Sequence, residues 1–290
     1  MYFTSLLSRL TNWLSKNTAI TVILVFLYSV FILEMHNPMV NISVWIMNGL
    51  SLPIFNKVVG TGCLLGMGVF LTVIVLQIRK DRQFLKQKLV YLFLTLLFIV
   101  IHSRVMFEMN IEIIHSIEFS LLAYLLFALS RSVGFAIVFA LPVMLLDEWN
   151  QYILLYPEYV MYYEFNDIVM DILGSGLALV TLSVFGIYPK CSNKSLWAKP
   201  EILFLFGLLT VTALAINSGY LAQYISTQNS NTVFAFNKMQ NPDNFWTIHS
   251  FTKARYHIMG PVEGITVIVM LCLFYAVWDN LIQDSELKEE

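Results

Sequence analysis

Acidic, histidine and glutamine side chains recur at helical spacing between residues 112 and 171, and their types suit ion binding or proton transfer. Residues three or four apart share one face of a helix, and positions 115/118, 147/151 and 167/171 all have this spacing. The GSG segment at 174–176 should let a neighbouring helix approach closely. The candidate site residues are His115, Glu118, Asp147, Glu148, Gln151, Asp167 and Asp171.

Two kinds of chemistry suit these residues. Carboxylate oxygens and an imidazole could hold a divalent cation, and the candidate metal ligands are His115, Glu118, Asp147 and Asp171. Alternatively, crowded carboxylates raise one another's pKa, so one of them could retain a proton and act as a general acid or relay.

A third interpretation is structural, with the side chains satisfying one another and the helix ends. However, the acids from Glu108 to Asp171 outnumber the nearby cationic candidates Arg104 and His115. Such an imbalance is costly at low dielectric, which favours a cation, either a metal or a substrate, as the missing partner.

The composition defines the environment of these residues. Hydrophobic residues make up 58% of the chain and charged residues 12%, and the mean hydropathy is +0.71. A soluble domain has about 25% charged residues, so this chain is too apolar to be one. The apolar residues form blocks near the roughly 20 residues that cross a bilayer as a helix. The sequence therefore predicts an all-α, polytopic transmembrane helical bundle.

Eight membrane spans account for these blocks and divide the chain into four parts. The predicted spans cover residues 18–35, 58–78, 87–106, 113–130, 132–149, 167–188, 201–219 and 260–282. Asn and Pro interrupt residues 37–57, which we expect to lie along the membrane interface. The parts are an amphipathic N-terminal segment (1–17), spans 1–3 (18–106), a core of spans 4–6 (107–189), and spans 7–8 with an outer loop at 220–259 (190–290).

The distribution of Lys and Arg predicts the orientation. If the N-terminus is inside, most of the seventeen Lys and Arg residues fall on the cytoplasmic side, as the positive-inside rule requires. Both termini are then cytoplasmic, and the candidate site residues lie at the extracytoplasmic ends of spans 4, 5 and 6.

Histidines elsewhere are expected to matter less. His36 and His102 stand alone and should be satisfied singly. The outer loop carries His249, His257, Lys253 and Arg255; it either folds over the site or remains solvated.

Three motifs in residues 112–176 resemble those of the VanZ-like family of bacterial integral membrane proteins. They are EIIHSIEFSLLAYLLF, LLDEWNQ and NDIVMDILGSGLAL. Family members show a His followed by Glu and an aromatic residue, then Asp-Glu-x-x-Gln, then Asp-x-x-x-Asn/Asp with a glycine behind it. Many also carry an Arg shortly before the third motif, whereas this chain reads YPEYVMYYEF there.

The resemblance covers less than a quarter of the chain. It implies a multi-pass protein of the bacterial cytoplasmic (inner) membrane. Some relatives are linked to resistance to the glycopeptide teicoplanin, but the resemblance implies no established reaction.

The leading hypothesis is a site in the outer leaflet that binds a cation or an envelope lipid, such as a lipid-linked precursor. His115 and Glu118 would be paired for acid/base chemistry there. An ion-coupled transporter is a second hypothesis, but the inner halves of spans 4–6 lack the polar residues that a conduction path needs. A structural or accessory membrane subunit is a third. The lipid bilayer is a partner in every case, and the sequence has no nucleic-acid-binding signature.

Overall fold

The computed structural model describes residues 2–190, 195–225, 233–248 and 253–286. Among these residues, eight helices are long and apolar enough to cross a membrane, so the chain is a multi-pass helical membrane protein. A backbone in hydrocarbon must satisfy its own hydrogen bonds, and a helix does so. The α-helices are α1 (Tyr2–Lys16), α2 (Thr18–Leu50), α3 (Leu52–Ile78), α4 (Leu85–Val105), α5 (His115–Ser130), α6 (Val133–Asn150), α7 (Phe165–Val184), α8 (Pro200–Asn217) and α9 (Pro261–Glu286).

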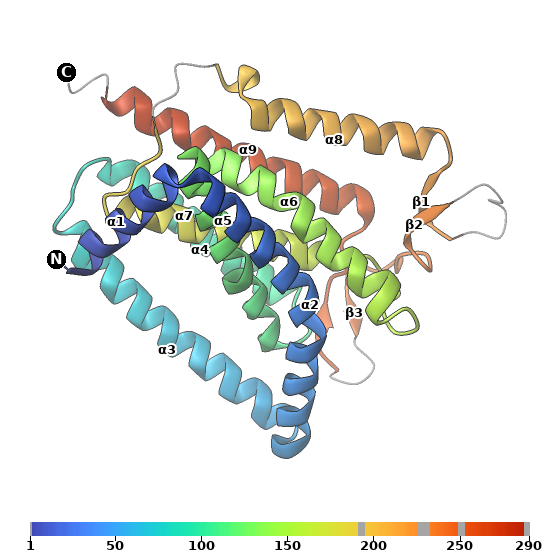
Figure 1. Cartoon of the computed structure of the whole chain (residues 1–290). Helices are drawn as coiled ribbons and strands as arrows, with labels where there is room; N and C mark the ends of the chain where they lie inside the picture. Colours follow the sequence, from blue (N-terminus) through green and yellow to red (C-terminus); the bar gives the residue numbers. More distant parts are fainter. Residues whose placement is uncertain (1, 191–194, 226–232, 249–252, 287–290) are drawn as a thin grey trace.

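Helix α7 is central in the bundle, and α3 and α8 are peripheral. In the most apolar window of each helix, 78% of the α7 residues are buried, compared with 6% in α3 and 17% in α8. Figure 1 shows α3 and α8 on opposite sides of the bundle. Helices α5 and α6 both pack against α7, so the three predicted site helices form one contiguous unit.

Gly174 lets α7 approach α5 closely. A Cβ atom at position 174 would lie 2.0 Å from the backbone oxygen of Ser116, so only glycine fits there. The Ser120 hydroxyl donates a hydrogen bond to the Gly174 carbonyl oxygen (3.2 Å) at the same level. The predicted close approach is therefore confirmed. It brings Asp171, about one turn earlier on α7, next to α5.

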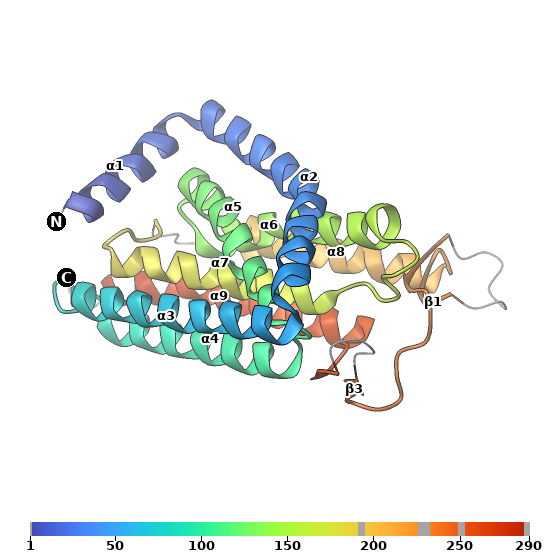
Figure 2. The same ribbon diagram turned by 90° about the horizontal axis from the view of Figure 1, so that it is seen from below.

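Helix α2 is longer than the sequence pattern predicts. The expectation that Asn and Pro break the helix within residues 37–57 is wrong, because α2 continues to Leu50 and α3 begins at Leu52. The expected location of this segment along the membrane interface stays a prediction. The two helices are separated only by Ser51, whose φ of 65° ends the first of them. Pro38 lies inside α2 and accounts for the change of direction visible in Figures 1 and 2.

Polar side chains from the end of α6 hold the α2 bend in place. The Asn150 amide donates to the Leu33 carbonyl oxygen (3.1 Å), and the Tyr156 hydroxyl donates to the Asn37 side-chain oxygen (3.1 Å). The second half of α2 is thereby directed towards the start of α5 and the end of α6.

The N-terminal segment forms helix α1, with an exposed apolar face. Leu6, Leu10 and Trp13 are exposed, whereas the Thr11 hydroxyl hydrogen-bonds Tyr124 of α5 (3.1 Å). One face thus contacts the bundle and the other offers the apolar side chains that an interfacial helix inserts into a membrane surface.

Paired polar groups lie at the end of the bundle where α1 begins and α9 ends (Figure 1). Asp279 of α9 accepts hydrogen bonds from the Ser132 hydroxyl (2.7 Å) and the Val133 N–H (2.9 Å), and so caps the start of α6. Lys88 is fully buried and donates to the Asp81 carboxylate (2.9 Å). These ionisable groups have structural partners.

The segment between α8 and α9 contains short strands, which an all-α prediction does not include. Strands β1 (Leu221–Tyr224) and β2 (Phe234–Asn237) pair in parallel, and β3 (Thr247–Ile248) pairs with β4 (Arg255–Tyr256) in antiparallel fashion. Figure 1 shows this segment at the end of the bundle opposite the termini.

Candidate functional site

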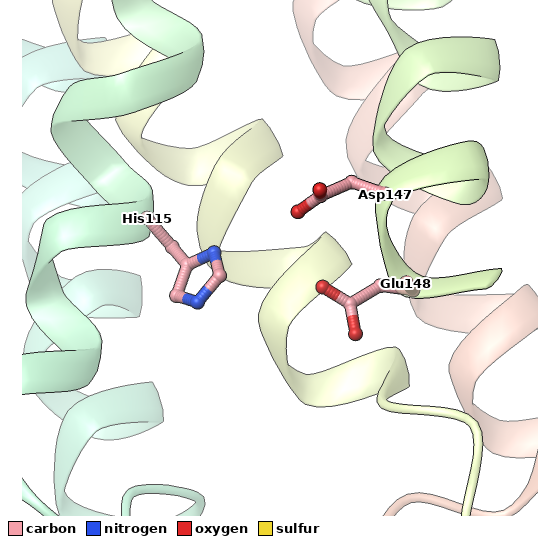
Figure 3. Close-up of side chains that lie close together, drawn as sticks. All are labelled: His115, Asp147 and Glu148. Carbon is pink, nitrogen blue, oxygen red and sulfur yellow. The ribbon is translucent and has the colours of Figure 1, made fainter. Parts of the chain in front are cut away.

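A buried cluster of one histidine and two acids lies between α5 and α6. His115, Asp147 and Glu148 each offer a ligand atom, and these atoms all lie within 4.8 Å of one another. The three residues are 7%, 0% and 1% exposed. Figure 3 shows the imidazole projecting from α5 towards the two carboxylates on α6.

Two acids of α7 face the same imidazole. The Asp171 carboxylate lies 3.4 Å from Nδ1 of His115, and the Asp167 carboxylate lies 3.6 Å from Nε2. Asp171 is fully buried because of the close α5–α7 approach. Both ring nitrogens of His115 therefore have a carboxylate nearby.

Gln151 connects the two acids of α6. Its side-chain amide donates to Asp147 (3.3 Å) and to Glu148 (2.9 Å). This residue begins the π-helical turn Gln151–Leu155, which extends α6. Such turns are common at functional sites because they redirect side chains. Here the turn keeps Gln151 at the end of the same helix as Asp147 and Glu148.

His36 belongs to the cluster, although the sequence pattern predicted that it stands alone. Its Nδ1 atom lies 3.7 Å from the Asp147 carboxylate, and its side chain is 10% exposed. The rings of His36 and His115 have centroids 6.2 Å apart. A signal was present, because residue 36 follows the predicted outward-running span 1 and so lies at the level of the acids. By contrast, His102 is buried near Asn166 and packs on Phe107.

Glu118 lies at the edge of the cluster. It is half-buried and close enough to His115, Asp147 and His36 to interact with them electrostatically. Its neighbour on the predicted helix face, Glu112, precedes α5 instead. The Glu112 carboxylate accepts hydrogen bonds from the Glu108 and Met109 N–H groups and so stabilises the 3-10 turn Asn110–Ile114.

The buried charges of the cluster do not balance. The carboxylates of Asp147, Glu148, Asp167 and Asp171 face two imidazoles, those of His36 and His115. If all four carboxylates are ionised, even two protonated imidazoles leave an excess of two negative charges. Within the described residues, several buried atoms also lack a hydrogen-bond partner, among them Asp147 Oδ1, Glu148 Oε2 and both Asp171 oxygens. The cluster thus offers ligand atoms for a cation, and several of these atoms have no hydrogen-bond partner within the described residues.

The acidic region continues just outside the membrane-spanning helices. Glu164 directly precedes α7, and burial raises the pKa of its carboxyl well above the usual value, with the nearby charges of Asp167 and Glu108 adding to the shift. Burial likewise raises the pKa of the Tyr163 hydroxyl, which donates to the Leu145 carbonyl oxygen (2.7 Å). Both groups therefore keep their protons to a higher pH than usual.

The described parts of the segment 220–259 lie at the end of the bundle opposite the termini (Figure 1). Lys238 donates hydrogen bonds to three carbonyl oxygens, those of Tyr152 (2.9 Å), Pro157 (2.6 Å) and Val160 (2.8 Å). Its ammonium group also lies over the Tyr152 ring, 4.3 Å from the centroid. The segment is therefore a strap that fastens the loop following α6, and many of its described residues, such as Tyr224, Met239 and Phe245, are exposed.

The other basic and histidine residues of the strap bind within it or to α9. Arg255 stacks on Trp246 (5.1 Å to the ring centroid), and His257 Nε2 lies 2.8 Å from the Glu263 carboxylate of α9. His249 lies outside the described residues. The expectation that cationic groups of this loop reach the site stays a prediction.

The fold and the cluster together define a class: multi-pass helical membrane proteins with a buried acid–histidine cluster at one end of the bundle. No protein-family model matches the chain, and no curated protein or solved structure is significantly similar to it. The VanZ-like resemblance therefore remains a prediction that rests on the three motifs.

Proposed function

We propose that this chain is a bacterial cytoplasmic-membrane protein that binds a divalent cation at the extracytoplasmic end of its bundle and uses that cation to bind an envelope lipid. The observation that carries the proposal is the convergence of His115, Asp147 and Glu148, whose ligand atoms lie within 4.8 Å of one another. Membrane-buried ionisable residues mark functional sites more often than structural ones.

The dimensions and the donor types of the cluster fit a metal ion. Metal–ligand bonds of roughly 2.0–2.6 Å allow two ligands of one ion to be up to about 4–5 Å apart, and the observed spacing is within that range. One imidazole with carboxylates suits Mn²⁺ or Zn²⁺.

The surroundings of His115 support the same proposal. A histidine that binds a metal through one ring nitrogen commonly donates its other N–H to a carboxylate, which orients the ring. Carboxylates lie 3.4 and 3.6 Å from the two ring nitrogens of His115. Either nitrogen can therefore bind the cation while Asp171 or Asp167 orients the imidazole.

The distribution of charge favours a binding site over an ion pathway. Beyond the cluster, residues 119–130, 133–146 and 172–184 contain no Asp, Glu, Lys, Arg or His. The charged groups at the opposite end, such as Asp279 and Lys88, are paired with structural partners. A conducting path would need polar groups in between.

Direct cation binding tests the proposal. Electron paramagnetic resonance should detect one tightly bound Mn²⁺ per purified wild-type chain, and Asp147→Asn should weaken its affinity at least tenfold. Glu158→Gln removes an exposed acid near the same end of the bundle and should leave the affinity unchanged. Wild-type protein that binds neither Mn²⁺ nor Zn²⁺, or that binds as well with Asn at position 147, would overturn the proposal.

A further inference from the structure

An apolar cavity of about 400 Å³ lies beside the cluster, between α2, α3 and the start of α5. Its volume is within the roughly 300–1,000 Å³ range of small-molecule sites. Its apolar walls include Phe31, Met35, Met39, Val40, Met47 and Phe55. The bend in α2 and its continuation to Leu50 create this cavity, so the sequence pattern could not reveal it.

The cavity and the cluster share residues. His36, His115, Glu118 and Gln151 also line the cavity. His36 lies 3.7 Å from Asp147, and Gln151 donates to both Asp147 and Glu148. A molecule in the cavity would therefore contact residues that also contact the proposed cation ligands.

The position of the cavity points to the bilayer as the source of its occupant. Helices α3 and α2 are the two least buried spans, with 6% and 11% of their most apolar windows buried. Their outer surfaces therefore face lipid in a membrane. A hydrocarbon chain could enter between them without crossing water.

The polar lining indicates the charge of the headgroup. The described residues that line the cavity include two imidazoles, those of His36 and His115, and two carboxylates, those of Glu112 and Glu118, but neither Asp147 nor Glu148. The Glu112 carboxylate already accepts hydrogen bonds from the Glu108 and Met109 N–H groups. The imidazoles and a cation behind them would attract an anion. Divalent cations in proteins are often held by one or two carboxylates together with a substrate phosphate.

We propose that this cavity binds the hydrocarbon tail of a single-chain lipid phosphate, with the phosphate on the cation that the cluster holds. This inference rests on the proposed function and names its substrate class. The apolar walls select the tail, and the imidazole of His36 contributes a donor for the phosphate oxygens. Without the cation, the carboxylates of the cluster would repel the same headgroup.

The test compares ligands that share one tail. Hexadecyl phosphate, hexadecanol and hexadecyltrimethylammonium are titrated against the full chain in phosphatidylcholine nanodiscs, with Mn²⁺ or with EDTA. Hexadecyl phosphate should bind at least tenfold more tightly with Mn²⁺ than with EDTA. Hexadecanol should bind weakly and equally in both conditions. Tighter binding of the cationic lipid than of the phosphate would overturn the headgroup assignment.

A matched pair of variants tests the cavity itself. Val40→Trp places bulk on the cavity wall and should weaken binding of hexadecyl phosphate at least tenfold. Ile42→Trp changes an exposed residue of the same helix that is not part of the lining and should have no effect. Both variants should bind Mn²⁺ like the wild type, which also shows that they are folded.

The two proposals fail in different ways. If Mn²⁺ binds but neither Mn²⁺ nor Val40→Trp alters binding of hexadecyl phosphate, the lipid inference is wrong and the cation site stands. If Mn²⁺ does not bind at all, the proposed function fails, and the lipid inference fails with it.

Discussion

Neutralising Asp147 should distinguish a cation site from a structural polar network. Asp147 is fully buried, and its Oδ2 atom accepts from Gln151 (3.3 Å) and lies 3.7 Å from His36. Asp147→Asn keeps the shape and retains one oxygen for the Gln151 bond. The substitution therefore removes one negative charge and little else.

The expected change in stability without cation is small. Removing the repulsion between Asp147 and Glu148 is worth about 3 kcal/mol at about 5 Å and an effective dielectric of about 20. Losing the contact with the His36 imidazole, 3.7 Å away, offsets this gain. Relief of repulsion from Asp167 and Asp171 favours the variant further. In EDTA, the free energy of unfolding should be unchanged or raised by about 1 kcal/mol.

Adding the cation should reverse the order of stability. At a concentration of about 100 Kd, the wild type gains about 2.7 kcal/mol. A variant that binds tenfold more weakly gains only about 1.4 kcal/mol at the same concentration. Thermal unfolding in detergent, with EDTA or with Mn²⁺, measures both values.

The control is Glu158→Gln, at an exposed acid, which should behave as the wild type in both buffers. If Asp147→Asn instead loses about 1–3 kcal/mol and Mn²⁺ changes nothing in either protein, the cluster is a satisfied structural network.

Four further predictions concern the scaffold and its orientation. Gly174→Ala places a Cβ 2.0 Å from the α5 backbone and should lower the free energy of unfolding by about 1–3 kcal/mol. Lys238→Met removes three hydrogen bonds to carbonyl oxygens and should cost about 1–3 kcal/mol in thermal unfolding. Although partial burial acts in the opposite direction, hydrogen bonds from Tyr188 and Lys88 hold the pKa of Asp81 below its ordinary 3.8. The ionised Asp81 carboxylate should therefore contribute stability that is complete above pH 3.8 and is lost as the pH falls below that value. In pH-dependent unfolding, the Asp81→Asn variant should not show this loss of stability. In a background without the three native cysteines, an impermeant thiol reagent should label a cysteine at exposed position 159 but not one at exposed position 83 in intact cells.

Each of these predictions has an outcome that contradicts it. A Cβ atom at position 207 would meet no atom of the described residues within 4 Å, so Gly207→Ala is the control for Gly174→Ala, and equal melting of the two would refute the packing claim. Lys57→Met is the control at an exposed lysine; a similar loss there would show that the strap contacts contribute nothing. An Asp81→Asn variant with the wild-type acid transition would exclude that carboxylate as its source. The reverse labelling pattern would place the cluster on the cytoplasmic side.

Periodicity and composition were sufficient to predict the spans. Apolar blocks of bilayer length give helices in any packing arrangement, because hydrocarbon leaves the backbone no other hydrogen-bond partners. The prediction failed at Pro38, where a local rule ended the helix too early. A proline removes one backbone donor, but contacts from α6 to Leu33 and Asn37 hold the chain there, and no local pattern contains them.

The sequence by itself determined the class of protein and most members of the cluster. Helical spacing places His115, the acids of α6 and α7, and Gln151 on particular helices, and hydropathy places these helices in a membrane. Spacing along a chain is a local property, so it can be recognised in the sequence without knowledge of the fold.

Only the tertiary structure decided which side chains meet. The close approach at Gly174 sets Asp171 against His115, and the bend in α2 brings His36 to Asp147. The same bend forms the apolar cavity and joins it to the cluster. Contacts between helices depend on side-chain shape and on hydrogen bonds over 100 or more residues of sequence, such as that from Asn150 to Leu33. Such contacts leave no periodic trace in the chain, so the ligand geometry and the cavity beside it could be found only in the folded bundle.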